Sequence, residues 1–576
     1  MNDSERRIAT PVLVIGTGGS GLRAAIELAE RGVGVLAVGK RPAADAHTTL
    51  AAGGVNAALA TMDPQDTWRQ HAADTLQEGY LLADPRTVRT VTENAARGIE
   101  DLVRYGMPFA READGSISQR FFGAHTWRRT AFSGDYTGLE IQRALVRRAA
   151  ALDVPILDTV HITRLLVEDD TVFGAYGFDP IDGRRLVVHA DAVILATGGH
   201  TRIWRRTSSR RDENTGDSFR LAVLAGARIR DPELVQFHPS GLLAPEDAAG
   251  TLVSEAARGE GGLLLNGRGE RFMARYDPER MELSTRDRVA LASYTEIKEG
   301  RGTPHGGVWL DVSHLPRETI MKRLPRVHRT LLDLQLLDIT TDPIEVAPTA
   351  HYSMGGVRVR PEDHGTDVAG LYAIGEAASG LHGANRLGGN SLIELLVYGR
   401  IAGEAAAAHS AGLRVQRRSA DALDEARREV DGLLACDGPE NPRGLQRAVR
   451  DIMTEHCGVV RDEEGLRTGL AELDAVEARI GALGVHPDNA GHQDLAHAFD
   501  LKSAVLAARA TLEAALERRE TRGCHNRSDH PELDRSLQVS LVWSGPGRIE
   551  REPIPPIPAD IASLMREVSS VGKLVE

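Results

Sequence analysis

The sequence has 576 residues, of which 41% are hydrophobic and 26% charged, as in an ordinary globular protein of several domains. Its formal net charge of −13 argues against a general nucleic-acid binder, which would carry a basic surface. Only three cysteines occur, with no CxxC spacing, and no apolar run is long enough for a bilayer, so the sequence excludes a disulfide framework and predicts neither a metal site nor a membrane span.

Short apolar runs predict strands that lead into glycine-rich segments. The first run, at 11–15, leads through a glycine turn and a helical pattern to a second run at 33–38, which together make a βαβ unit. Similar runs at 192–196 and 371–374 are followed by Thr-Gly-Gly and Gly-Glu-Ala. Strands that deliver glycines at their carboxyl ends are typical of an α/β nucleotide-binding sheet.

The remaining segments predict further domains. Between 236 and 346 the strand–helix rhythm is lost, and from 418 to 520 helical patterning dominates. The last fifty residues contain a Pro-Ile-Pro-Pro-Ile-Pro run and indicate an extended tail with a short terminal helix. The predicted organisation is a discontinuous nucleotide-binding domain at 1–235 and 347–417, an inserted domain at 236–346, a helical domain at 418–525 and a tail at 526–576.

The turn after the first strand reads Gly16-Thr17-Gly18-Gly19-Ser20-Gly21. Gly16 permits a tight bend, Gly18 lets the backbone reach a pyrophosphate, and Gly21 lets the helix pack closely. In this setting the turn favours dinucleotide binding over a plain strand–helix connection. The acid that would bind a ribose hydroxyl after the second strand is absent, because Lys40 stands there, and this argues against NAD.

The segment Ala46-His47-Thr48-Thr49-Leu50-Ala51-Ala52-Gly53-Gly54 follows the second strand. With the glycine turn, it resembles the flavoprotein subunit of the succinate dehydrogenase/fumarate reductase family, whose histidine at this place is bonded to FAD. The resemblance implies a covalent flavin on His47, which would raise the flavin's potential toward that needed to oxidise an unactivated alkane. The alternative is that His47 is an ordinary loop histidine.

The resemblance runs over nearly the whole chain and implies an α/β fold with a Rossmann-like FAD-binding domain, an inserted α+β capping domain and a C-terminal helical domain. The block Gly383–Leu392 is its most specific part. The implied FAD contacts are Gly16, Gly18, Gly19, Ser20, Gly21, Lys40, His47, Thr48, Ala52, Gly53, Gly54, Thr197, Gly198, Asp217, Glu376, Ser391 and Leu392.

The resemblance also implies a site for a C4 dicarboxylate. Two planar carboxylates are best held by guanidinium groups and by histidine or hydroxyl donors. The segments Phe237–Gly241, Ser254–Gly262 and His351–Gly356, with the Gly383–Leu392 block, match the family's substrate segments. The implied substrate-binding residues are His238, Ser254, His351 and Arg386.

Proton transfer is implied for Arg286, in Ser284-Thr285-Arg286-Asp287, with Glu255 and Arg258 as a relay to solvent. Because a free arginine stays protonated at neutral pH, the site must bias this residue. A surface ion pair is the alternative for Arg286 alone.

A second cluster is made of loop arginines, and we predict a solvated loop face, with a partner surface or a phosphate contact as the alternative. It consists of Arg202, Arg205, Arg206, Arg210 and Arg211. Family members usually pass electrons to partners, namely a membrane anchor and an iron–sulfur subunit. The resemblance therefore implies such partners, and we expect a cytoplasmic protein that these subunits can hold at the inner face of the cell membrane.

Two other functions are open. L-aspartate oxidase is a relative, and Gly307–His314 and Pro348–Tyr352 look at least as much like that enzyme. It binds FAD without a covalent link, has a small hydroxyl residue where this chain has His47, and carries a glutamate for the substrate amino group where this chain has Phe121–His125. An unpaired substrate ammonium would be costly, so aspartate is disfavoured. The third function is a non-catalytic flavin-binding scaffold. It is disfavoured because a scaffold would be expected to lose at least one of the implied site residues, and all are present: His238, Glu255, Arg286, His351 and Arg386.

Overall fold

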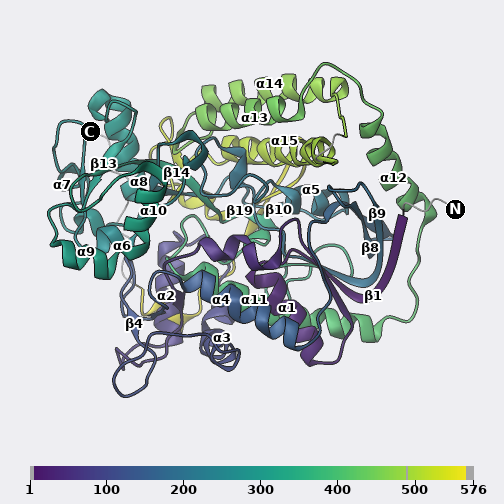
Figure 1. Ribbon diagram of the computed structural model, residues 1–576, viewed down its shortest axis with the longest axis horizontal. Helices are drawn as coiled ribbons and strands as arrows, with labels where there is room; N and C mark the ends of the chain where they lie inside the picture. Colours follow the sequence, from purple (N-terminus) through teal and green to yellow (C-terminus); the bar gives the residue numbers. More distant parts are fainter. Residues whose placement is uncertain (1–4, 488–490, 566–576) are drawn as a thin grey trace.

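The computed structural model describes residues 5–487 and 491–565 (Figure 1). Its central sheet has seven strands in the order β6-β2-β1-β9-β8-β7, with β16 also paired to β9. The first three strands, β9 and β16 are parallel, while β7 and β8 run antiparallel to their neighbours. These strands are β1 (Glu5–Ile15), β2 (Val35–Val38), β6 (Ile156–Leu157), β7 (His161–Glu168), β8 (Thr171–Phe178), β9 (Arg185–Leu195) and β16 (Leu371–Ala373).

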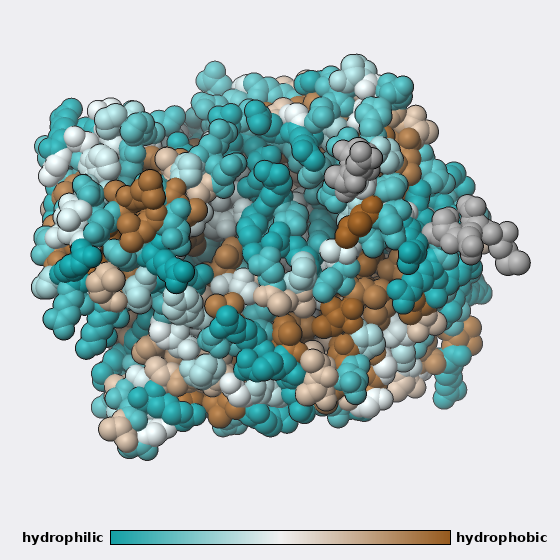
Figure 2. All heavy atoms as spheres, in the orientation of Figure 1, coloured by the Kyte–Doolittle hydropathy of each residue, from teal (hydrophilic) through white to brown (hydrophobic). Residues whose placement is uncertain are grey.

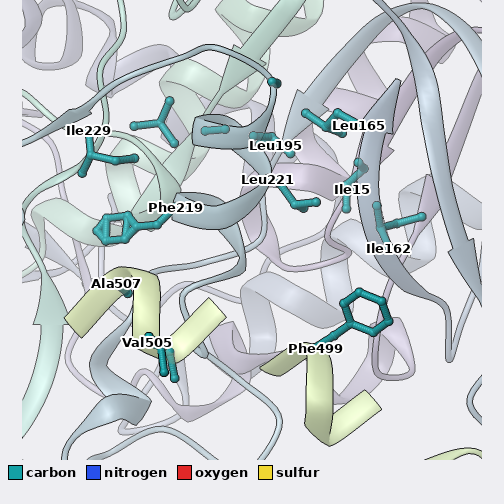
Figure 3. Packing of buried hydrophobic residues seen from close by; sticks show 14 of the residues in the cluster. Ile15, Ile162, Leu165, Leu195, Phe219, Leu221, Ile229, Phe499, Val505 and Ala507 are labelled. Carbon is teal, nitrogen blue, oxygen red and sulfur yellow. The ribbon is translucent and has the colours of Figure 1, made fainter. Parts of the chain in front are cut away.

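Both faces of this sheet are covered, because the alternating side chains of β1 are apolar on each side. Val12 and Val14 belong to a core with helices α1 and α11, whereas Leu13 and Ile15 belong to a core with α5 and α15. Figure 3 shows Phe499 and Val505 of α15 in this second core, which also holds Leu195 and Leu221. The covering helices are α1 (Gly19–Glu30), α2 (Trp68–Glu78), α3 (Pro85–Arg104), α4 (Thr137–Ala151), α5 (Asp217–Leu224) and α11 (Asn390–Gly412).

The inserted domain is built on a second, antiparallel sheet with the order β11-β14-β13-β12. Its core contains Leu264, Val289 and Leu310. Its strand β14 runs on to Ser353, where the chain returns to the domain that holds the central sheet. Its elements are β11 (Val235–Leu242), α6 (Ala256–Gly259), β12 (Leu263–Leu265), α7 (Met273–Tyr276), α8 (Arg286–Glu296), β13 (Val308–Asp311), α9 (Arg317–Arg323), α10 (Pro325–Gln335) and β14 (Ile344–Ser353).

The helical segment packs against the central sheet (Figure 1). Its amphipathic helices bury an apolar stripe, for example Leu445, Val449 and Ile452 of α13, whereas α15 is buried around most of its surface. The helices are α12 (Ala420–Leu434), α13 (Pro442–His456), α14 (Glu463–Arg479) and α15 (Gln493–Glu517). None of the described helices is long and apolar enough to cross a membrane.

The C-terminal segment differs from the predicted extended tail. The strands β19 (Val539–Gly545) and β20 (Arg548–Pro553) form a hairpin that pairs with β10 (Ile229–Arg230), and β10 in turn pairs with β15 (Gly356–Val357). The hairpin forms because Leu541, Val542 and Trp543 are buried, and the proline run, which masked this signal in the sequence, begins only where β20 ends. The predicted short terminal helix is present as α16 (Ala559–Ala562).

Two small sheets complete the described chain. One pairs β17 (Val460–Arg461) with β18 (Asn526–Arg527), and the other has the order β3-β5-β4. The latter lies beside the His47 segment and contains β3 (Val55–Asn56), β4 (Gln119–Arg120) and β5 (Thr130–Ala131).

Candidate functional site

A cavity of about 1340 Å³ opens at the carboxyl ends of β1, β2 and β9, the usual ligand position in an open α/β sheet. The inserted domain and the helical domain also contribute to its wall. Figure 2 shows one face of the molecule, which is hollowed near its middle and bordered mostly by hydrophilic residues. All the predicted site residues line this cavity except Gly21 and Arg258.

The glycine turn forms the wall at the start of α1. Gly16 has φ +111°, and a Cβ there would lie 2.1 Å from the carbonyl oxygen of Ala196, so only glycine fits. Gly21 faces away from the cavity, because a Cβ on it would lie 1.9 Å from the Gly16 carbonyl oxygen. Its predicted place among the FAD contacts is therefore a packing role behind the turn.

The first residues of α1 line the cavity, and the start of a helix is a place where backbone N–H groups stabilise a pyrophosphate. The Gly19 N–H donates to Thr48 Oγ1 at 2.9 Å, which ties the His47 segment to the turn. Thr197 Oγ1, also predicted as an FAD contact, is buried and has no partner within the described residues. The size of the cavity, the helix start and this orphaned hydroxyl fit a bound FAD.

His47 lies in a short 3₁₀ turn, and its Nδ1 is 2.8 Å from Glu213 Oε2. Burial would raise the pKa of Glu213, but hydrogen bonds and charges from His47 and Arg210 outweigh it and hold this pKa at about 2. An ionised carboxylate only accepts hydrogen bonds, so Nδ1 of His47 carries a proton. Burial would lower the pKa of His47, but the hydrogen bond and charge of Glu213 raise it. Once the ring loses its second proton, Nε2 is the nitrogen that is free to bond elsewhere.

Lys40, which stands where the acid is missing after β2, pairs with two acids from elsewhere in the fold. Lys40 Nζ lies 2.5 Å from Asp217 of α5 and 2.7 Å from Asp500 of α15. Burial would lower the pKa of Lys40, but these two carboxylates raise it, so the ammonium stays charged. Asp500 was not predicted as a site residue, since it is 460 positions from Lys40.

At the other end of the site, two guanidinium groups share one neutral acceptor. Arg286 Nη1 donates to Gln236 Oε1 at 3.2 Å, and Arg386 Nη2 donates to the same oxygen at 3.0 Å. The amide group of Gln236 is fixed by donating to Asn385 Oδ1 at 2.8 Å and to the Arg386 carbonyl at 3.0 Å. Sequence reasoning missed Gln236, although its place two residues before His238 on β11 was a usable signal.

Glu255 holds the other side of Arg286, with Arg286 Nε at 2.8 Å from Glu255 Oε2. Burial would raise the pKa of Glu255, but the charges of Arg286 and Arg258 outweigh it and hold this pKa at about 2. Arg258 lies behind Glu255, at 3.9 Å, and donates to the Glu282 carbonyl at 2.6 Å. The three residues predicted as a relay are therefore adjacent, with Arg258 outside the cavity wall.

Two histidines lie beside these arginines, of which His238 is buried and His351 is half-buried. The rings of His238 and His351 are 5.4 Å apart and meet edge to face. Burial, together with the neighbouring arginines, lowers the pKa of each far below its usual range, so both rings are neutral. The Ser240 N–H donates to His238 Nδ1 at 3.2 Å, which leaves the proton on Nε2 as a hydrogen-bond donor.

The remaining predicted contacts surround this end of the cavity. Ser391 Oγ accepts from Arg386 Nη1 at 3.1 Å, and Glu376 accepts from the Ser353 N–H at 3.0 Å. Arg120, which sequence reasoning missed, donates to the carbonyls of Ala52 and Gly53 and holds the segment after His47 in place. Gly18, Gly54, Gly198 and Leu392 also line the cavity, as does Ser254, whose hydroxyl accepts from the Ala256 N–H at 3.3 Å.

The loop arginines, which the sequence predicted to be a solvated face, are solvated in part, since Arg205 and Arg211 are exposed. All five line the cavity, and Arg202, Arg206 and Arg210 are half-buried. Arg210 forms ion pairs with Asp45 and Glu213. The partial burial of the other three was not predicted, because a run of like charges in sequence does not show which other elements fold over it.

Comparison with known proteins identifies the class. Residues 11–392 match the FAD binding domain family, and residues 446–555 match the family described as "Fumarate reductase flavoprotein C-term". The fold and the site are those of an FAD-binding oxidoreductase.

The chain is 42% identical to one of the subunits of fumarate reductase (CoM/CoB) from Methanothermobacter marburgensis, over 92% of this chain and 96% of that protein. It is 34% identical to the succinate dehydrogenase flavoprotein subunit of Rickettsia bellii, over 97% of each. A solved chain of the Mycobacterium smegmatis Sdh1 complex with UQ1 superposes with a TM-score of 0.88 at 37% identity, over 96% of each chain. The protein belongs to the succinate dehydrogenase/fumarate reductase flavoprotein family, which confirms the predicted resemblance and fold class.

Proposed function

We propose that this protein interconverts succinate and fumarate, with FAD attached covalently through His47. The observation that carries the proposal is the cluster of two arginines and two neutral histidines at one end of the FAD cavity. The guanidinium forks and imidazole N–H groups are donors suited to two carboxylates. Relatives named as fumarate reductase and succinate dehydrogenase subunits support the substrate class.

Bound FAD would supply the hydride acceptor or donor. The protein's own groups would do the rest: Arg386 and the histidines hold the carboxylates, and Arg286 gives or takes the proton on the substrate carbon. Glu255 accepts two N–H groups of Arg286 and aims the third nitrogen, Nη1, at Gln236. A proton that reaches Arg286 would travel through Glu255 and Arg258, which form the contiguous relay described above.

L-aspartate oxidase is the first alternative, and the site disfavours it. The stretch Phe121–His125 borders the reactive end, since Gly123 lies near Glu255, and it offers no carboxylate to a substrate ammonium. Glu255 itself is already held by Arg286. A non-catalytic scaffold is the second alternative, and the intact network from Gln236 to Arg258 argues against it.

Partners are proposed on the same basis. Several relatives are named as subunits of succinate dehydrogenase or fumarate reductase. We propose that this chain likewise works with an iron–sulfur protein, at the cytoplasmic face of a membrane when a membrane anchor is present.

The test is to purify the protein under native conditions and follow succinate-dependent dye reduction and fumarate-dependent dye oxidation. Turnover with succinate or fumarate and none with aspartate supports the proposal. Turnover with aspartate alone would show that the protein is an L-aspartate oxidase instead. A flavin-loaded protein that turns over none of succinate, fumarate and aspartate would favour the non-catalytic scaffold.

A further inference from the structure

Seven of the arginines that line the cavity come from two elements that are far apart in the chain. Four follow the 3₁₀ turn Thr201–Ile203 or lie in it, and three lie on α13. The three on α13 are spaced at i, i+4 and i+7, so they share one face of the helix. All seven line the cavity, and together we name them the arginine rim: Arg202, Arg205, Arg206, Arg211, Arg443, Arg447 and Arg450.

The charge of the arginine rim is largely uncompensated. Arg205 pairs with Asp451 at 2.6 Å, whereas the other six make no ion pair with any carboxylate in the described ranges. The neighbouring Arg210, by contrast, pairs with Asp45 and Glu213. The imbalance is notable because the chain as a whole carries a net charge of −13.

Like charges in the rim act on each other. Burial, followed by the charges of Arg450 and Arg211, lowers the pKa of Arg202 to about 10. Burial and the neighbouring arginines also lower the pKa of Arg450. Such repulsion destabilises the folded chain, and an anion bound against the rim would relieve it.

The rim lies beside the proposed flavin attachment, while Arg206 also adjoins the dicarboxylate end, since its carbonyl accepts from the N–H of Ala350, next to His351. Arg211 directly follows Arg210, whose partner Glu213 also holds His47. The dicarboxylate groups Glu255 and Arg286 belong instead to the inserted domain. Arg205, Arg211, Arg443 and Arg447 are exposed, so their guanidinium groups are open to a large partner.

We propose that the arginine rim is the docking surface for the protein that exchanges electrons with the flavin, and that this partner presents an acidic face. The inference rests on the proposed function. Oxidation of one succinate to fumarate releases two electrons and two protons; the electrons reduce the partner and the protons go to solvent, and fumarate reduction runs in reverse. A basic rim steers an acidic protein to this opening and sets its orientation.

The experiment uses the flavin-loaded protein and two small one-electron acceptors of opposite charge, anionic ferricyanide and cationic hexaammineruthenium(III). The variant is Arg443→Glu/Arg447→Glu. The matched control is Arg414→Glu, at an exposed arginine that does not line the cavity. None of these three arginines belongs to the proposed catalytic groups.

At low ionic strength and limiting acceptor, succinate-dependent ferricyanide reduction should fall about tenfold in the double variant, and hexaammineruthenium reduction should rise. Salt should shrink both changes. The control should match the parent protein. Equal ratios of the two rates in the parent and the double variant would overturn the proposal.

A protein-sized probe tests docking itself. Reduced plant-type ferredoxin, an acidic protein, should be oxidised in the presence of fumarate more slowly by the double variant and more slowly at high salt. If neither the double variant nor high salt slows the oxidation of ferredoxin, the proposed docking surface is overturned. Turnover of succinate with neutral benzoquinone separates the two proposals: its absence defeats the proposed function, while its presence without any charge effect defeats only the rim.

Discussion

At the scale of single residues, the tautomer of His47 is fixed by a neighbour. Glu213 accepts from Nδ1, so the reactive Nε2 is available for a flavin link. We predict that denatured protein keeps its flavin on the polypeptide and that His47→Ser releases all of it. The measurement is flavin absorbance of the acid-precipitated chain.

Glu213→Gln serves as the matched control for this prediction, because it keeps the shape and the hydrogen bond but removes the charge. We expect it to retain FAD with a smaller covalent fraction. Release of all flavin from the unaltered protein on denaturation would contradict the covalent link, whatever the variants do.

Gln236 matters because its amide oxygen is neutral. It accepts from two cations, Arg286 and Arg386, and leaves the charge of both available to the dicarboxylate. We predict that Gln236→Glu, which adds a carboxylate of the same shape, raises the KM for fumarate about tenfold, equivalent to about 1.4 kcal/mol of lost binding. Steady-state kinetics and flavin absorbance on fumarate binding measure this effect.

The comparison variant is Gln236→Leu, which removes the acceptor without adding charge. We expect kcat to fall more than affinity, because Arg286 loses the contact that orients Nη1. If Gln236→Glu and Gln236→Leu change KM and kcat in the same proportions, charge is not the reason for glutamine at this position.

At the scale of elements, the turn between β1 and α1 depends on one backbone conformation. At Gly16 both the positive φ and the nearby Ala196 carbonyl oppose any side chain. We predict that Gly16→Ala yields protein without FAD and with a melting temperature lower by several degrees, because the turn and α1 must shift. FAD content and thermal unfolding measure it.

Gly432→Ala is the control for the glycine turn. Gly432 is exposed in α12, and a Cβ there would meet no atom within 4 Å, so alanine should stabilise the helix slightly. Normal FAD loading in Gly16→Ala would show that the turn tolerates a side chain and that its geometry is not required.

The elements that the sequence reveals best are those whose signal is local. The glycine turn and the His47 segment are short continuous patterns, and the fold and family that they suggested are confirmed. The C-terminal hairpin was missed because its partner strand, β10, lies more than 300 residues earlier and the nearby proline run dominates the pattern.

Contacts between distant segments set the other limit on sequence prediction. Gln236 meets Arg386 across 150 positions, and Lys40 meets Asp500 across 460. A single glutamine or aspartate in a helix or strand does not indicate such a role, because it is usually a solvated or structural residue. The roles assigned to Arg286, Glu255 and the histidines likewise stay predictions until variants are measured.

At the scale of the whole molecule, Lys40 joins parts of the chain that fold as different layers. It follows β2 of the central sheet, while Asp217 begins α5 and Asp500 lies on α15 of the helical domain. The side chain of Asp500 is only 8% exposed, so its charge depends on this partner. The pair therefore couples the helical domain to the FAD-binding domain at the cavity wall.

We predict that this coupling is measurable as a double-mutant cycle. Lys40→Met and Asp500→Leu should each lower the free energy of unfolding, because Lys40→Met leaves Asp217 and Asp500 without their cation and Asp500→Leu removes one of the two partners of Lys40. The double variant should recover about 1–3 kcal/mol of the summed loss. The exposed pair Arg329–Asp333, at 3.7 Å on α10, is the control and should show no measurable coupling. Since Asp217 still pairs with Lys40 in Asp500→Leu, that variant should be the milder of the two single changes. Additive losses in the cycle would mean that the Lys40–Asp500 pair does not couple the two domains.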